Sequence, residues 1–141
     1  DSSAFAKFTG RSISNPGMFM YEEFAKTGIK TTDYYKGKVV VLVNETTQSN
    51  SEFVTMALQT APTTTFIGSS SAGADANVTP ISLPGAITTW YSGLGVYYPD
   101  GTNAQRVGVK INKVVKPTID GIKTGKDEVL EEAKKLILIN K

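Results

Sequence analysis

The pattern of apolar and polar positions is most regular between residues 39 and 67. Residues 39–43 are all apolar, which predicts a strand covered on both faces, as in a parallel sheet. A polar turn follows, and from Glu52 the apolar positions recur with the period of a helix that ends before Pro62. Residues 63–67 predict a second strand. This order of elements predicts a right-handed βαβ crossover.

The segment before this unit is less regular. Residues 1–35 are interpreted as a lead-in that packs on the core or on missing upstream parts, and residues 36–141 as the core itself. The lead-in carries too many aromatic side chains for a solvated tail. A short helix is expected at residues 20–25, with Gly28 as its stop.

The segment after this unit predicts short strands and one helix. A loop of small residues at 69–77 comes first, and residues 107–111 are expected to be extended. Thr124 and Asp127 have the spacing of a capping-box variant in front of an amphipathic helix. The short strands are expected at residues 78–83, 86–91 and 96–98, and the apolar stripe of the helix at residues 129, 130, 133, 136 and 137.

Composition limits the chemistry. The chain has 141 residues, enough for one domain, and a net charge of +2 with scattered basic residues, so no nucleic acid is expected as a partner. No apolar run approaches the roughly 20 residues that span a bilayer. The chain has no cysteine and no histidine, so no metal or cofactor is expected, and no Ser–His pair can be completed inside it. The first residue is not Met, which suggests a processed or excised piece.

Ser49, in the polar turn, has two interpretations. Ser49 and Glu52 form the pattern S-x-x-E, which is a capping box for the following helix. On spacing alone this role is favoured, because capping boxes are far commoner than nucleophiles. The alternative is a nucleophile, since a turn between a buried strand and a helix exposes its side chains beside the free N–H groups of the helix.

Four segments in register resemble a known family. They are LVNETTQSNSEFVTMALQ, FIGSSSAGADANV, LPG and YYPDGTNAQRVGV, and over about residues 36–140 they resemble the catalytic core of the S41 serine peptidases. That family comprises the C-terminal-processing (tail-specific) proteases and the tricorn-type core. The resemblance implies an α/β fold, the Clp protease/crotonase-like spiral of β-β-α units. The chain would be a partial domain with a parallel-rich mixed sheet and flanking helices.

The resemblance assigns roles to individual residues. Ser49 falls on the nucleophile, and its own N–H or that of Asn50 would bind the oxyanion. Gly73 and Asp75 fall in the loop that would line the oxyanion or substrate site, although for Asp75 hydrogen bonds that stabilise the loop are the favoured role. Gln105 falls where the tricorn-type branch has a glutamate that supports a histidine base. It is either that support or an ordinary polar residue.

The chain also departs from the processing branch, in which a lysine after the second strand is the base. The corresponding residue here is Ala74. The resemblance therefore implies a fragment of a serine endopeptidase that acts on peptides or unfolded proteins. It would be inactive alone, because the upstream part of the same polypeptide holds the base. The compartment is unknown, with an extracytoplasmic location favoured by the resemblance alone. The alternatives are a non-catalytic peptide-binding relative and a crotonase-like acyl-CoA enzyme.

Overall fold

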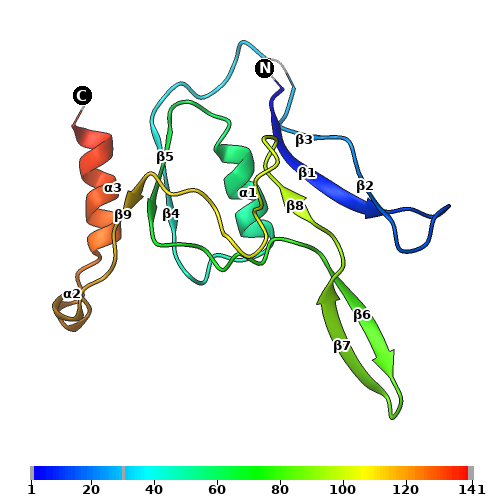
Figure 1. The fold of residues 1–141 in the computed structure, drawn as a ribbon. Helices are drawn as coiled ribbons and strands as arrows, with labels where there is room; N and C mark the ends of the chain where they lie inside the picture. Colours follow the sequence, from blue (N-terminus) through cyan, green and yellow to red (C-terminus); the bar gives the residue numbers. More distant parts are fainter. Residues whose placement is uncertain (1, 30, 140–141) are drawn as a thin grey trace.

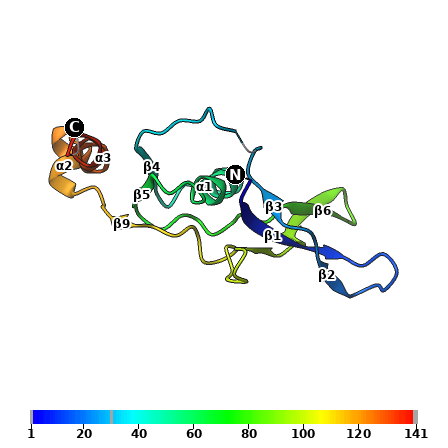
Figure 2. The same ribbon diagram turned by 90° about the horizontal axis from the view of Figure 1, so that it is seen from above.

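A computed structural model describes residues 2–29 and 31–139. A small parallel sheet lies between two helices, α1 (Asn50–Leu58) and α3 (Glu128–Leu138). The two views agree that α3 covers one face of this sheet and α1 the other (Figures 1 and 2). On its far side, α1 packs against the long first strand, β1 (Ala4–Arg11). The helix that follows Ser49 is thus held between two sheets.

The strand–helix–strand unit predicted from the sequence is confirmed. Strand β4 (Val39–Val43) pairs in parallel with β5 (Thr64–Gly68), and β5 pairs in parallel with β9 (Lys113–Val114). Helices lie on both faces of β4, as expected, but they cover it incompletely, since Leu42 is 43% exposed. Strand β4 is the edge strand of the three-stranded sheet.

The helix expected at residues 20–25 is wrong. The segment instead forms β2 (Phe19–Tyr21) and β3 (Ala25–Lys26), which both pair antiparallel with β1. A helix of six residues is marginal in water, whereas β1 offers a partner for the backbone hydrogen bonds. Strand β1 also pairs with β8 (Val96–Tyr97).

The aromatic side chains of the first segment have different environments. The ring of Phe53 on α1 lies 4.8 Å from that of Phe5 and 5.8 Å from that of Phe8. Phe5 and Phe8 thus pack on the core, whereas the others are exposed. The boundary between lead-in and core at residue 35 stays a prediction. The exposed aromatic residues are Phe19, Tyr21, Phe24, Tyr34 and Tyr35.

Strands β6 (Val78–Leu83) and β7 (Ile87–Ser92) form the expected hairpin, which projects from the rest of the molecule (Figure 1). Every residue of both strands is exposed. Residues 107–111, expected to be extended, form no strand.

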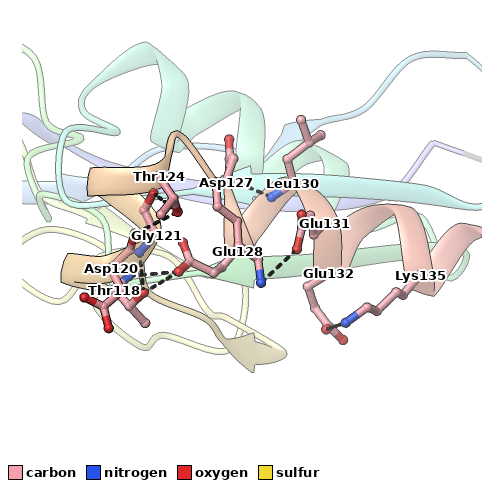
Figure 3. Close-up of polar contacts among 11 residues, drawn as sticks. Thr118, Asp120, Gly121, Thr124, Asp127, Glu128, Leu130, Glu131, Glu132 and Lys135 are labelled. Carbon is pink, nitrogen blue, oxygen red and sulfur yellow. Dashed lines mark hydrogen bonds and ion pairs between the residues drawn. The ribbon is translucent and has the colours of Figure 1, made fainter.

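The described chain ends in two helices, whereas the sequence predicted one. The unpredicted helix, α2 (Ile119–Thr124), begins at Thr118, whose Oγ1 accepts a hydrogen bond from Gly121 N at 2.9 Å. Helix α3 begins at Asp127, whose Oδ1 accepts from Leu130 N at 2.9 Å (Figure 3). The expected capping-box role of Thr124 is therefore wrong, since Thr124 ends α2 and its hydroxyl donates to the carbonyl of Asp120 at 2.8 Å.

The buried apolar core lies around α1 and joins residues far apart in the sequence. The core residues are Phe5, Ala6, Val43, Met56, Ala76, Val96, Tyr98, Ala104 and Val109.

Among the described residues, no helix is both long and apolar enough to cross a bilayer.

Candidate active site

Ser49 has an unusual backbone conformation. Its φ of 54° and ψ of −123° are rare for a residue with a side chain, and such strain costs roughly 1–3 kcal/mol. The residue lies immediately before α1, at the end of the turn that leaves β4, and it is exposed. The capping box predicted from the sequence is present, with the Ser49 side chain beside the N–H of Glu52 and the Glu52 carboxylate bound to Ser49 N. The Ser49 hydroxyl itself forms no regular cap hydrogen bond, and the N–H of Glu52 donates to the Ser49 carbonyl at 2.8 Å.

Glu52 holds the Ser49 turn in place. Its carboxylate is 1% exposed, and the Oε2 atom accepts hydrogen bonds from Ser49 N at 3.2 Å and from Ala74 N at 2.8 Å. The Oε1 atom accepts from Gly73 N at 2.8 Å and from Ser71 Oγ at 2.6 Å. Four donors satisfy this buried charge, which also lies in the first turn of α1, where the helix dipole favours an anion. The Glu52 half of the capping box is therefore also a clamp between two loops.

The sequence indicated Glu52 only as a helix cap. The S-x-x-E pattern gives its bond to Ser49. The other three partners lie 19, 21 and 22 residues away along the chain, and no local pattern predicts them.

The loop at 69–77 is fixed to both neighbouring segments. Ala72 N donates to the carbonyl of Thr47 at 2.9 Å, and Arg106 N donates to the carbonyl of Gly73 at 2.7 Å. Gly73 has a φ of +66°, and a Cβ there would come within 3.0 Å of the Arg106 backbone. Gly73 therefore allows the loop backbone to lie close to the backbone of Arg106. Its N–H is not available to a ligand, because it already donates to Glu52.

Asn50 is the first residue of α1 and is exposed. Among the described residues no backbone carbonyl or side chain accepts a hydrogen bond from its N–H. The unpaired N–H adjoins the Ser49 side chain at the positive end of the helix dipole. This is the arrangement that an oxyanion site needs.

Asp75 differs from Glu52 although it lies in the same loop. Only 7% of its surface is exposed, yet its side chain makes no hydrogen bond with any described residue, and Oδ2 is fully buried. Burial, together with the nearby charge of Glu52, raises the pKa of Asp75 to about 6. The Asp75 side chain thus makes none of the loop-stabilising hydrogen bonds expected from the sequence, and its carboxylate has no partner among the described residues.

Gln105 is joined to the same loop. Its Oε1 atom accepts a hydrogen bond from Ala76 N at 2.8 Å, and its Nε2 atom donates to Ser92 Oγ at 3.4 Å. Gln105 therefore holds the backbone of the residue that follows Asp75. Glu52 connects that network to Ser49 and Gly73.

A cavity of about 440 Å³ opens at the edge of the sheet where β4 and β5 end. Asn44 and Glu45 of the Ser49 turn line one side, and Val115, Pro117 and Ile122 give the other side an apolar surface. The cavity could hold a side chain of a bound peptide. Within the described ranges, no cluster of three or more His, Cys, Asp or Glu residues could hold a metal ion.

Comparison with known families gives one match. The model of peptidase family S41 matches residues 5–115, which is most of the chain and includes the Ser49 turn, the loop at 69–77 and Gln105. The chain belongs to peptidase family S41. The match begins earlier than the resemblance at residues 36–140, so the first strands are part of the family's fold. No curated protein matches the chain with significance.

Solved structures agree with this family. A candidate peptidase from Parabacteroides merdae superposes with a TM-score of 0.85 at 17% identity, over 98% of this chain and 44% of that one. Mature CPAF in complex with lactacystin gives 0.70 at 25% identity, over 79% and 22%. The photosystem II D1 C-terminal processing protease gives 0.56 at 19% identity, over 82% and 28%. The predicted Clp/crotonase-like α/β fold is confirmed. The chain spans less than half the length of each of these three structures.

Proposed function

We propose that the chain is the part of a serine endopeptidase that carries the nucleophile, Ser49. The observation that supports this most strongly is the strained backbone of Ser49, which is exposed at the start of α1. A strained turn between a strand and a helix is a known position for a nucleophilic serine, because such a turn exposes Oγ to the substrate. Strain of this kind persists only where the surroundings enforce it, and the Glu52 clamp does so.

The chemistry follows from this geometry. A general base takes the proton of Ser49 Oγ as the oxygen attacks a peptide carbonyl, and the Asn50 N–H donates to the oxyanion that forms. The base then gives the proton to the leaving amine, and the acyl group stays on Ser49 until water hydrolyses the ester. The apolar cavity beside Asn44 and Glu45 would take a side chain of a peptide or unfolded protein.

The base must come from outside this chain. The chain has no histidine, and Ala74 occupies the position of the lysine in the processing branch. The chain also spans 44% of the Parabacteroides merdae structure, which leaves room for a further segment. We infer that an upstream part of the same polypeptide supplies the base and that the isolated chain is inactive. An extracytoplasmic location stays a prediction from the resemblance.

The test compares the chain with the polypeptide extended upstream. The extended protein should cleave an unstructured protein substrate, and Ser49→Ala should abolish this cleavage. Ser51→Ala is the matched control, because Ser51 is exposed two residues further on and should leave the rate unchanged. The isolated chain should show no Ser49-dependent cleavage, and clear turnover by it would contradict the assignment of the base.

A non-catalytic peptide-binding relative is the second candidate. The observation in its favour is that Gln105 has no means of supporting a base. Its amide is uncharged, and both polar atoms are already hydrogen-bonded, to Ala76 N and to Ser92 Oγ. If the extended protein binds the substrate tightly but does not cleave it, this second function is correct.

A further inference from the structure

We propose that Asp75 is the carboxylate that orients and stabilises the general base of this peptidase, in place of Gln105. This inference rests on the proposed function, in which Ser49 is the nucleophile. It assigns to Asp75 a positioning role that acts through the base.

Gln105 cannot provide this support. An imidazolium or ammonium base needs a negative charge beside it, and a neutral amide supplies none. Both groups of the Gln105 amide are already used, by the N–H of Ala76 and the hydroxyl of Ser92. These contacts give Gln105 another role, that of holding the loop at the residue after Asp75.

Asp75 has what Gln105 lacks. Its carboxylate is almost completely enclosed but has no hydrogen-bond partner among the described residues. Buried carboxylates in folded proteins are nearly always paired, because an unpaired charge in a poorly solvated place is costly. The raised pKa of Asp75 agrees with a missing partner of positive or proton-donating character. An imidazole N–H or a lysine ammonium has that character.

The position of Asp75 is set by two anchors. On one side, Glu52 Oε2 binds both Ala74 N and Ser49 N, so a single oxygen atom joins the loop to the nucleophile. On the other side, Gln105 holds Ala76 N. Asp75 is thus fixed close to the Ser49 turn by residues that are themselves satisfied, as a group that must orient a base requires.

Asp75 neither takes up nor releases a proton in the proposed reaction. The proton moves from Ser49 Oγ to the base and then to the leaving amine, while Asp75 stays ionised and stabilises the charged base between these steps. Loss of the charge should therefore slow the chemical step and leave substrate binding unchanged.

The experiment uses the upstream-extended polypeptide and three variants. Asp75→Asn should lower kcat roughly 10²- to 10⁴-fold with KM unchanged. In the isolated chain, where Asp75 has no partner among the described residues, the urea unfolding midpoint of the variant should be equal to or above that of the wild type, because a buried, unpaired charge is removed. Asp75→Glu, which keeps a carboxylate at this position, should have a kcat at least roughly tenfold above that of Asp75→Asn. Asp33→Asn, an exposed aspartate in the first segment, is the matched control and should not change the rate.

The outcomes separate this inference from the function on which it rests. If Ser49→Ala keeps its activity, the proposed function itself is wrong. If Ser49→Ala is inactive but Asp75→Asn stays within threefold of the wild type, only the role of Asp75 is wrong. A lowered unfolding midpoint for Asp75→Asn in the isolated chain, or a kcat of Asp75→Glu as low as that of Asp75→Asn, would also overturn the inference.

Discussion

Two adjacent parts of the chain differ in how their polar groups are satisfied. The site region, residues 44–76, is a network in which Glu52 alone accepts four hydrogen bonds. The hairpin, residues 78–92, follows directly, and every residue of its two strands is exposed. A non-glycine residue with positive φ occurs in each part, Ser49 (54°) in the site region and Ala86 (59°) in the hairpin turn, and of these two Ser49 is the one bound by the buried Glu52. If this comparison is right, equivalent substitutions should cost far more in the site region than in the hairpin.

The largest effect is expected at Glu52. All four of its partners are donors, and the Glu52→Gln side chain keeps one acceptor oxygen and adds two N–H donors that face them. The free energy of unfolding of the chain should fall by about 3 kcal/mol or more, measured by urea denaturation. Glu23→Gln, on an exposed glutamate of the first segment, should cost less than about 0.5 kcal/mol. Equal losses for both would show that the clamp does not stabilise the fold.

A matched pair of glycines tests backbone strain in the two parts. Gly68 has a φ of +129°, and a Cβ there would collide with the carbonyl oxygen of Val43. Gly85, in the turn of the hairpin, has a φ of +85° and no atom within 4 Å of the added Cβ. Gly68→Ala should therefore lower the free energy of unfolding by roughly 2–4 kcal/mol, and Gly85→Ala by about 1 kcal/mol. Calorimetric melting of both variants measures the difference, and a reversed order would refute the strain argument.

The sequence predicted the parts of the molecule that depend on local pattern. Strands β4 and β5 and helix α1 follow from the apolar period of residues 39–67, and the hairpin follows from the turn at Pro84 and Gly85. Strands β2 and β3 were missed because they pair with β1, and nothing in residues 20–25 records that partner. Helix α2 was missed because it has only six residues, too few for a clear apolar period.

The same limit explains what the sequence indicated about the site. Ser49 and Glu52 are close in sequence, so their pattern was visible, but the clamp to Gly73 and Ala74 requires the fold. The enclosed, unpaired state of Asp75 could not be predicted either. It results from packing of the loop between α1 and the segment that holds Gln105, and it has no counterpart in residue spacing.

A smaller effect, with a defined pH dependence, is expected at Asp75. The pKa of Asp75 is about 6 in the folded chain and near 3.8 when unfolded, so between these values the folded state binds the extra proton. Stability should therefore rise by roughly 1–2 kcal/mol as the pH falls from 8 to 5, with Glu52 as the neighbouring charge that Asp75 senses. Asp75→Asn should remove this rise and be the more stable protein at pH 8. Urea midpoints across this range measure it, and identical pH profiles would contradict it.

The smallest effect is expected at Trp90, in the hairpin. Trp90 lies opposite Pro80 in the β6–β7 register, and its side chain is largely exposed, so it buries little apolar surface. Trp90→Ala should change the free energy of unfolding by about 0.5 kcal/mol or less, because only a cross-strand contact is lost. The measurement is again the urea midpoint, repeated at two protein concentrations. A loss above about 1 kcal/mol that grows with concentration would mean that the hairpin is covered by a second molecule in solution. The contrast between a site region with buried, hydrogen-bonded polar groups and an exposed hairpin would then hold only for the isolated, monomeric chain.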